Sequence, residues 1–415
     1  MHRKIEACRI CGNTKLTEAL DLGIHALTGV FPRSGSHCVT TGPLKLVKCT
    51  GDAADTCGLL QLQHTYDMGE LYGDNYGYRS GLNASMVSHL RGKVHRILER
   101  ISLPRGALII DIGSNDSTTL QAYPEGEYIR VGVDPTAEKF RQFYPRTVAL
   151  VPEFFSAEAV RRHCGDRKAT VITSFSMFYD LEDPLAFMKQ VRELLDDQGV
   201  WVFEQSYMPT MLQKCSYDTV CQEHLEYYAL KQLKWMADRC DLKLVEIEFN
   251  DVNGGSFSVT AATQSSPYKE SAQVAAILQI ETLLGLDTPQ PYERFARRIA
   301  DHKAALREFL ERAAQSGKSV GALGASTKGN VLLQYCNVTD AEISQIGDVN
   351  PEKFGRFTPG SRIPIVSEEE ALGARPDFLL ILPWHFRSFF LTRPGLSGRN
   401  LVFPLPELEV VRCPG

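Results

Sequence analysis

The stretch Ala107-Leu-Ile-Ile-Asp-Ile-Gly-Ser-Asn-Asp-Ser117 decides the fold class of this 415-residue chain. Its apolar half predicts a buried strand, and its polar half, followed by a helical pattern, predicts a turn between a strand and a helix. Gly113 in that turn would let the backbone come close to a bound ligand, because glycine carries no side chain. The stretch therefore predicts the opening unit of a parallel sheet with helices on its faces.

Strand and helix patterns alternate on both sides of this stretch. An amphipathic helix is predicted from Gly81 to about Ser102, because apolar residues recur there at three- and four-residue spacing. Short apolar runs of the kind that form buried strands follow at 130–134, 169–173 and 199–203. Helical patterns separate the strands, at about 117–122, 136–143, 156–163 and 184–196. Together they predict an α/β fold with a doubly wound, Rossmann-like sheet.

The first 65 residues have a different composition, rich in glycine, threonine and cysteine. Cys8-Arg-Ile-Cys11 has the spacing that lets two thiolates bind one tetrahedral zinc, and Cys49 and Cys57 are the other two predicted ligands. Four thiolates leave no open position, so such a zinc would be structural. Cys38 is a competing ligand, and buried cysteines without a metal are the alternative.

The length of the chain exceeds what one hydrophobic core usually organises. A nearly continuous helical pattern runs from about 268 to 317, and a second alternation of strands and helices begins at Ser319. We expect three domains. They are a small zinc-binding domain at 1–75, a Rossmann-like core at 76–265 and a second, smaller Rossmann-like domain at 266–415.

The strand ends of the predicted core carry side chains suited to an adenosine-containing cofactor. Asp134 ends the second strand, where a carboxylate can accept hydrogen bonds from ribose hydroxyls. The turn at Gly113 lacks the second and third glycines that a pyrophosphate needs, which disfavours NAD and favours S-adenosylmethionine. An acidic and an aromatic residue after the third strand would suit adenine. The predicted cofactor-binding residues are Asp111, Gly113, Asn115, Asp116, Asp134, Glu153 and Phe154.

The segment 216–228 is dense in titratable and hydroxyl side chains and follows the last predicted strand of the core. In an open α/β sheet this position lies near the carboxyl edge, where ligands bind. His224 is the candidate general base, since an ordinary imidazole titrates near pH 6.5. A hydrogen-bonded histidine on a polar helix face is the alternative. Cys221 is a candidate nucleophile, although methyl transfer from a sulfonium needs none.

The overall charge and hydropathy disfavour several classes of partner. Lysine and arginine number 45 against 50 aspartate and glutamate, a formal net charge of -5, and the absence of a long basic block disfavours nucleic acid. No run approaches eighteen apolar residues, and the first residues form no apolar signal region. We therefore expect a cytoplasmic protein with no membrane partner.

Taken together, these segments resemble the sugar C-methyltransferases of deoxysugar pathways, over nearly the whole chain. That family combines a cysteine zinc-binding domain, a class I methyltransferase core and a C-terminal nucleotide-sugar-binding domain. The matching stretches are Cys8-Arg-Ile-Cys11, Cys57-Gly-Leu-Leu-Gln-Leu62, Ile110-Asp-Ile-Gly-Ser-Asn-Asp116, Phe203-Glu204, Glu223-His224, Asn253-Gly-Gly255, Gly324-Ala-Ser-Thr-Lys328 and Arg356-Phe-Thr-Pro-Gly360.

The resemblance implies methylation of a carbon atom in a dTDP- or GDP-linked keto-deoxysugar, with S-adenosylmethionine as the methyl donor. The family's base histidine and adjacent glutamate fall on His224 and Glu223, and an active-site tyrosine falls on Tyr76 or Tyr78. The histidine would remove the proton beside the keto group, and the enolate would attack the methyl group. Where the family has a tyrosine three positions before the histidine, this chain has Cys221, which leaves the exact sugar open. The predicted substrate-binding residues are Lys328, Lys353, Arg356, Cys221 and Asn253.

Two other functions remain open at the level of sequence. A nucleotide-sugar oxidoreductase or epimerase would bind NAD in either α/β half, with 321–324 as its phosphate turn, although no full glycine fingerprint is present. A zinc-stabilised binding module would use the nucleotide folds for recognition alone.

Overall fold

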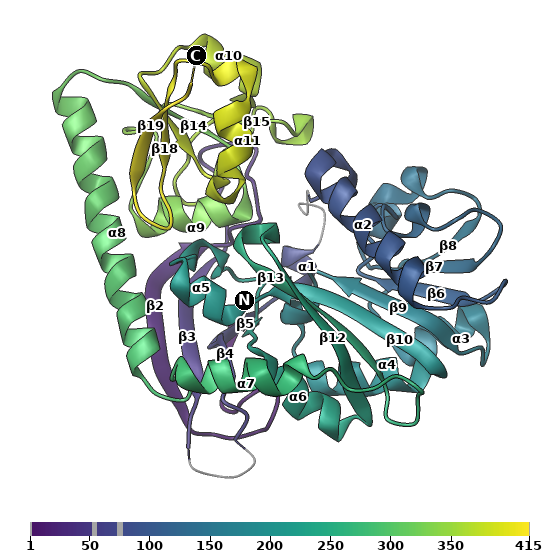
Figure 1. The fold of residues 1–415 in the computed structure, drawn as a ribbon. Helices are drawn as coiled ribbons and strands as arrows, with labels where there is room; N and C mark the ends of the chain where they lie inside the picture. The colour runs from purple at the N-terminus through teal and green to yellow at the C-terminus, as the bar shows by residue number, and fades with distance from the viewer. Residues whose placement is uncertain (1, 52–55, 73–77, 415) are drawn as a thin grey trace.

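Three sheets of four or more strands organise the protein (Figure 1). The computed structural model describes residues 2–51, 56–72 and 78–414. The mixed α/β fold class with parallel sheets is the one that the sequence predicts. The predicted domain boundaries at 75 and 265 stay a prediction.

The central sheet has seven strands in the order β12-β13-β10-β9-β6-β7-β8. All are parallel except β13, which runs antiparallel to both of its neighbours. The chain crosses from one side of β6 to the other between β8 and β9, so the carboxyl edge beside β6 is the topological switch point where α/β proteins bind ligands. The strands are β6 (Leu108–Ile112), β7 (Ile129–Val133), β8 (Val148–Val151), β9 (Ala169–Phe175), β10 (Leu195–Ser206), β12 (Leu242–Asn250) and β13 (Ser256–Thr263).

Helices cover both faces of this sheet (Figure 1). Helix α2 buries Leu90, Val94 and Ile97, the apolar side of the predicted amphipathic helix. Two of the predicted helices, 117–122 and 136–143, are instead short 3-10 turns, and prolines at 124 and 145 follow them closely, where the residue before a proline avoids helical geometry. The elements are α2 (Ala84–Arg100), η2 (Leu120–Ala122), η3 (Ala137–Phe143), α3 (Ala157–Cys164), η4 (Phe178–Asp180), α4 (Pro184–Leu194), α5 (Met208–Gln213), η5 (Tyr217–Thr219), α6 (Leu230–Arg239) and η6 (Val252–Gly254).

The N-terminal sheet has the strand order β11-β4-β3-β2, and a separate ribbon pairs β1 with β5. Its edge strand β11 does not come from the N-terminal segment, because it lies directly after the segment that contains His224. The sequence did not predict this strand, since two residues carry no periodic signal. The elements are β1 (His2–Lys4), β2 (Leu16–Ala26), β3 (Thr41–Cys49), β4 (Leu60–Leu62), β5 (His64–Tyr66), α1 (Met68–Leu71), η1 (Ser80–Leu82) and β11 (Glu226–Tyr227).

The C-terminal sheet has the order β16-β15-β14-β17-β18-β19, parallel except for β19, and β14 lies at its switch point. Long helices lead into it, and α8 runs beside β2 (Figure 1). The predicted helical run 268–317 is broken around Gly285, which has a φ of +71°. The elements are α7 (Gln273–Leu283), α8 (Gln290–Gln315), β14 (Val320–Leu323), α9 (Thr327–Tyr335), β15 (Ile346–Asp348), η7 (Pro351–Lys353), β16 (Ile365–Ser367), α10 (Glu368–Gly373), β17 (Phe378–Ile381), η8 (Trp384–Phe386), α11 (Arg387–Thr392), η9 (Pro394–Leu396), β18 (Asn400–Phe403) and β19 (Glu409–Arg412).

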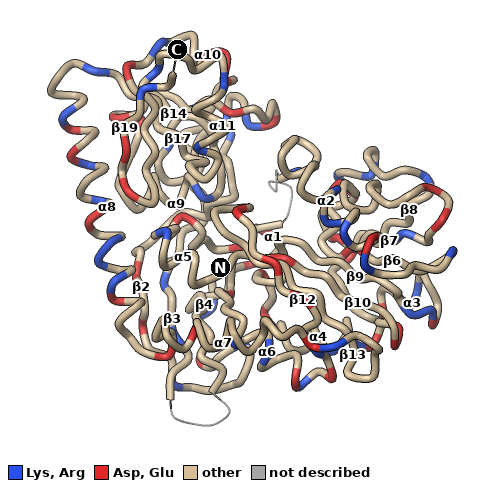
Figure 2. Tube along the Cα trace, viewed as in Figure 1, with Lys and Arg blue, Asp and Glu red and all other residues tan. Residues whose placement is uncertain are grey.

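Positions of lysine and arginine and positions of aspartate and glutamate are interspersed along α8 (Figure 2). Within the described residues, none of the helices combines the length and the hydropathy needed to cross a bilayer.

Candidate active site and metal site

Four thiols from the N-terminal segment lie together. The Sγ atoms of Cys8, Cys11, Cys49 and Cys57 are all within 4.8 Å of one another, and two of the pairs are 3.5 Å apart. A tetrahedral zinc with bonds of about 2.3 Å would separate its sulfur ligands by about 3.8 Å, so the donor set fits that metal. Cys38, the competing ligand, is exposed and does not belong to the cluster.

The local backbone explains why these thiols meet. Cys8 begins a tight turn in which the Gly12 amide donates to the Cys8 carbonyl at 2.9 Å. Cys49 ends β3, and its amide donates to the Leu59 carbonyl at 2.8 Å, which joins the second pair of cysteines to the same sheet. The Asn13 side-chain amide lies 3.3 Å from Cys49 Sγ, a contact typical of the groups that surround bound thiolates.

The turn after β6 has the shape of a cofactor cradle. Gly113 has a φ of +73°, and a Cβ added there would press on Met177 at 3.0 Å. The Asp134 carboxylate accepts hydrogen bonds from the Asn115 amide at 2.8 Å and from the Thr136 amide at 2.7 Å. Asp134 thereby connects the ends of β6 and β7.

Asp111, on β6, is the most strongly perturbed acid of this turn. Its carboxylate accepts a hydrogen bond from Thr173 Oγ1 at 2.5 Å, and it is 2% exposed. Burial raises the pKa of the Asp111 carboxyl to about 7, although the hydrogen bond from Thr173 opposes the shift.

Asn115 and Asp116 use their side chains to hold the segment that precedes α2. Asn115 Oδ1 accepts from the Ser80 amide at 2.9 Å, and Asp116 Oδ2 accepts from the Gly81 amide at 2.9 Å. The Asn115 side-chain amide also donates to the Tyr78 carbonyl at 3.1 Å. These two residues fix the segment over the sheet edge. Tyr78 is half exposed at 49%, and Tyr76 lies outside the described residues.

Glu153 and Phe154 lie on the surface beyond β8. Glu153 pairs with Arg162 at 2.6 Å, and the Phe154 side chain is 56% exposed. The structure does not place them against the Gly113 turn, so their role in binding adenine stays a prediction.

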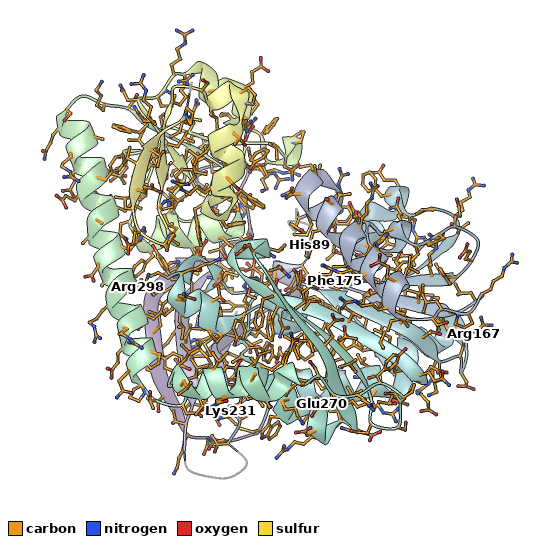
Figure 3. All side chains as sticks on the ribbon, in the orientation of Figure 1. His89, Arg167, Phe175, Lys231, Glu270 and Arg298 are labelled. Carbon is orange, nitrogen blue, oxygen red and sulfur yellow. The ribbon has the colours of Figure 1, made fainter. Side chains whose placement is uncertain are left out.

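The structure shows a polar network at the end of β10 that the sequence analysis did not predict. Glu204 accepts hydrogen bonds from His89 Nε2 at 2.6 Å and from the Asn250 side chain at 2.8 Å, and it pairs with Lys93 Nζ at 2.8 Å. Figure 3 shows His89 on α2 and Phe175 at the end of β9, both near the carboxyl edge of the central sheet. The contact of Glu204 with His89 joins residues more than a hundred positions apart, so no local spacing in the sequence indicates it.

The neighbouring Gln205 is also relevant. It is 1% exposed, and neither its side-chain oxygen nor its nitrogen has a hydrogen-bond partner among the described residues. A buried, unpaired amide at the carboxyl edge of a Rossmann-like sheet fits a bound polar ligand. Together with the Gly113 turn, it supports a cofactor at this edge.

His224 lies in the turn between η5 and β11. Its Nδ1 lies 2.8 Å from the Thr219 carbonyl oxygen, and its ring packs on Tyr179 with centroids 4.2 Å apart. Because a carbonyl oxygen only accepts hydrogen bonds, Nδ1 carries the proton and Nε2 has a free lone pair. Burial, assisted by the positive charge of Lys328, lowers the pKa of His224 to about 3. The imidazole is therefore neutral at physiological pH, with Nε2 unprotonated.

Glu223 faces a loop of the N-terminal segment. Thr28 Oγ1 lies 3.5 Å from Glu223 Oε2, and a side chain at Gly29 would collide with the Glu223 carboxylate. Burial raises the pKa of Glu223, as it does that of Asp180, which lies close enough to Glu223 for the two carboxyls to repel each other. The sequence did not single out Thr28, Gly29 or Asp180, because they approach Glu223 only through the tertiary fold.

Lys328, in α9, reaches the same region from the C-terminal domain. Its Nζ donates to the Asn253 carbonyl at 2.7 Å, and burial lowers its pKa. The charge of Asp218 opposes this shift by raising the pKa of Lys328. Asp218 also accepts a hydrogen bond from Trp384 Nε1 at 2.8 Å. Burial, together with Lys328, lowers the pKa of His385 to about 3. A buried cation thus lies near the candidate base.

The other two predicted substrate cations hold the domains together. Lys353 Nζ donates to the Ala325 carbonyl at 2.6 Å and lies 4.8 Å from the centre of the Phe31 ring. Arg356 Nη1 donates to the Phe31 carbonyl at 3.2 Å and lines a cavity of about 370 Å³ beside Phe354 and Phe357. Neither cation lies free in solvent. Cys221 is fully buried, and burial raises the pKa of its thiol, which makes it a poor nucleophile.

Three parts of the chain therefore meet at one place. They contribute Thr28, Glu223 with His224, and Lys328, and the Asn330 side-chain amide joins the first to the last by donating to the Thr28 carbonyl at 2.7 Å.

Comparison with known proteins identifies the family of this chain. Three family models match in order: a zinc binding domain over residues 8–72, a methyltransferase domain over 86–247 and a C-methyltransferase C-terminal domain over 251–406. The chain is 30% identical to the C-methyltransferase NovU of Streptomyces niveus, an alignment that covers 99% of this chain and 97% of NovU. The chain belongs to the C-methyltransferase family. It is an S-adenosylmethionine-dependent C-methyltransferase with a zinc-binding N-terminal domain.

Two solved methyltransferase structures match part of this C-methyltransferase. The CcbJ methyltransferase from Streptomyces caelestis is 14% identical, with a TM-score of 0.33 over 42% of this chain and 89% of that one. An S-adenosylmethionine dependent methyltransferase from Mesorhizobium loti is 13% identical, with a TM-score of 0.34 over 41% of this chain and 99% of that one.

Proposed function

We propose that this C-methyltransferase methylates the carbon beside the keto group of a nucleotide-linked keto-deoxysugar, with His224 as the general base. The observation that carries the proposal is the hydrogen bond from His224 Nδ1 to the Thr219 carbonyl, which leaves Nε2 free to accept a proton. A carbonyl acidifies the neighbouring carbon, so an imidazole held at hydrogen-bond distance suffices to remove its proton.

The proposed reaction begins with loss of a proton from the substrate carbon. The carbon–hydrogen bond breaks, the proton moves to His224 Nε2, and the electron pair moves toward the carbonyl oxygen to give an enolate. S-adenosylmethionine, when bound near Gly113, supplies an electrophilic methyl group. The enolate carbon would bond to that methyl group as the methyl–sulfur bond breaks and its electron pair returns to sulfur, which gives S-adenosylhomocysteine. The carbon then carries a methyl group in place of its proton, and His224 releases the proton to solvent. No oxidant or reductant is required.

Enolate charge needs a donor nearby. Buried donors stabilise a developing oxyanion strongly because little water competes with them. Lys328, whose charge already acts on His224, is a proposed donor to the enolate oxygen or a proposed contact of the substrate diphosphate. Tyr76 and Tyr78 remain proposed donors from the segment that Asn115 and Asp116 hold in place. Glu223 would orient a sugar hydroxyl.

The remaining proposed contacts are with the nucleotide part of the substrate and with the cofactor. Lys353, Arg356 and Asn253 would stabilise the nucleotide-sugar side, and the Arg356 cavity has room for a planar base. Asp111, Gly113, Asn115, Asp116, Asp134, Glu153 and Phe154 remain the proposed cofactor residues. The domain division at 75 and 265 is likewise proposed.

The test is a reaction of the full chain with S-adenosylmethionine and a panel of dTDP-, GDP- and CDP-linked keto-sugars, followed by mass spectrometry and NMR. A product heavier by one methylene, with the new carbon bonded to a ring carbon, is expected. Methylation on oxygen, or turnover of no keto-sugar by a protein that binds S-adenosylmethionine, would refute the proposal.

A further inference from the structure

A buried contact joins two segments: the cysteine turn 8–11, here called the metal knuckle, and the segment 219–228 that contains His224, here called the catalytic turn. Arg9 lies inside the knuckle, between Cys8 and Cys11, and its side chain is 3% exposed. Arg9 Nε lies 3.7 Å from Glu226 Oε1, and the Glu226 side chain is 0% exposed. Glu226 is two positions after the candidate base, so this contact connects the metal site with the active site.

Arg9 is also bonded to the strand that lies between the two sites. Its guanidinium donates to the Leu62 carbonyl at 2.6 Å and to Thr65 Oγ1 at 2.9 Å, and its backbone amide donates to Gln61 Oε1 at 3.1 Å. Strand β4 contains Gln61 and Leu62, and Gln61 pairs with Glu226 of β11. The guanidinium therefore fixes β4 and β11 together.

The contact continues to the base through the backbone. The Leu62 amide donates to the Leu225 carbonyl at 2.8 Å, and the Leu225 amide donates to the Tyr179 carbonyl at 2.7 Å. Tyr179 is the ring on which His224 packs. Leu225, the residue after His224, is thus bonded to β4 through its carbonyl and to η4 through its amide.

We propose that Arg9 is a positioning residue for the methyl transfer: through Glu226 and the β4–β11 pairing, the metal knuckle holds His224 in its catalytic orientation. The inference rests on the proposed role of His224, and it gives the N-terminal domain a function beyond its own stability. A buried ion pair often adds little stability but can specify one arrangement of the chain. Here it specifies where the catalytic turn lies.

The variants are Arg9→Met, Glu226→Gln and the double variant. Arg3→Met is the matched control, because Arg3 also joins the N-terminal segment to the core, through Glu182 at 2.6 Å, but on an exposed surface. For each protein, zinc content, S-adenosylmethionine affinity, kcat, KM and amide hydrogen exchange of the 219–228 segment are measured.

Arg9→Met is expected to keep its zinc and its affinity for S-adenosylmethionine, to exchange the Leu225 and Glu226 amides faster, and to lower kcat by about 10- to 100-fold with KM little changed. The double variant is expected to lose no more than the worse single variant, since both remove the same contact. Arg3→Met is expected to match wild type.

Equal amide exchange in Arg9→Met and Arg3→Met would overturn the inference, as would additive losses of kcat in the double variant. If Arg9→Met does not fold, Glu226→Gln decides alone, because it preserves the shape of the side chain and removes the acid group that faces Arg9. The exchange measurement needs no substrate. A wild-type protein that is inactive on every keto-sugar would therefore refute the proposed function and still leave the inference decided by exchange.

Discussion

The Nδ1 atom of His224 lies 2.8 Å from the carbonyl oxygen of Thr219, five residues earlier in the chain. This hydrogen bond fixes the tautomer of the imidazole and points Nε2 away from η5. We expect the activity of the enzyme to depend on that arrangement.

Replacing His224 by asparagine is expected to lower kcat by about 100-fold or more, because the substitution removes the base while leaving a polar side chain of similar size. The dissociation constant for S-adenosylmethionine, measured by calorimetry, is expected to stay within about twofold. His163→Asn, on the exposed side of α3, is the control and should behave as wild type. Full activity of His224→Asn would rule out this histidine as the base.

The pH dependence of kcat/KM follows from the lowered pKa of His224. A base with a pKa of about 3 stays unprotonated from pH 5 upward, so the profile is expected to lack the acidic limb near pH 6.5 that an ordinary histidine gives. Initial rates between pH 5 and 8 test this. A limb centred near pH 6.5 in wild type that only His224→Asn abolishes would show that the free enzyme keeps a solvated imidazole.

Lys328→Met is expected to raise the KM for the nucleotide sugar by about tenfold, because it removes a buried cation from the substrate junction. Binding of S-adenosylmethionine should be unchanged. Lys318→Met, which removes an exposed lysine of the same domain that pairs with Asp377, is the control. An unchanged KM in Lys328→Met would place the substrate's phosphates elsewhere.

Loss of a metal ligand is expected to act on stability. Cys11→Ser should lose its zinc, measured by atomic absorption, and melt at a lower temperature than wild type, since a structural zinc contributes to folding. Cys38→Ser removes an exposed thiol outside the cluster and should retain one zinc per chain. Equal zinc content in the two variants would contradict the four-thiolate assignment.

Asp111 makes stability depend on pH in a direction that can be stated. Its folded-state pKa of about 7 exceeds the value of about 3.9 in an unfolded chain, so between these values the folded state binds the extra proton and stability falls as the pH rises. Without cofactor, the free energy of unfolding of Asp111→Asn, relative to that of wild type, should rise by up to about 1.4 kcal/mol per pH unit from pH 4 to 7. Above pH 7 the difference should level off. Denaturation at several pH values, with exposed Asp166→Asn as control, measures the difference.

The sequence predicted the parts of this protein that have local signals. The buried strands of the central sheet carry apolar runs, and the C-x₂-C motif carries its own spacing, so the sheet and the thiol pair Cys8 and Cys11 follow from neighbouring residues alone. The predicted helices at 117–122 and 136–143 were wrong. Both segments form 3-10 turns, and each turn is followed within two residues by a proline, before which helical geometry is disfavoured.

The site itself depended on contacts that have no local signal. Thr28 approaches Glu223, and Glu204 gathers His89 and Asn250, only after distant segments pack together. Strand β11 consists of two residues and is defined by its partner β4. Such features follow from the tertiary fold, in which the chemistry of each residue is set by neighbours far away in sequence.

The hydrogen bond from Asn330 to Thr28 has a consequence for synthesis of the protein. A ribosome releases Thr28 early and Asn330 about three hundred residues later. A growing chain therefore possesses its thiols, its nucleotide-binding turn and its histidine while the substrate junction is still open on one side. Helix α9, which carries both Lys328 and Asn330, can close that side only after it has emerged from the ribosome.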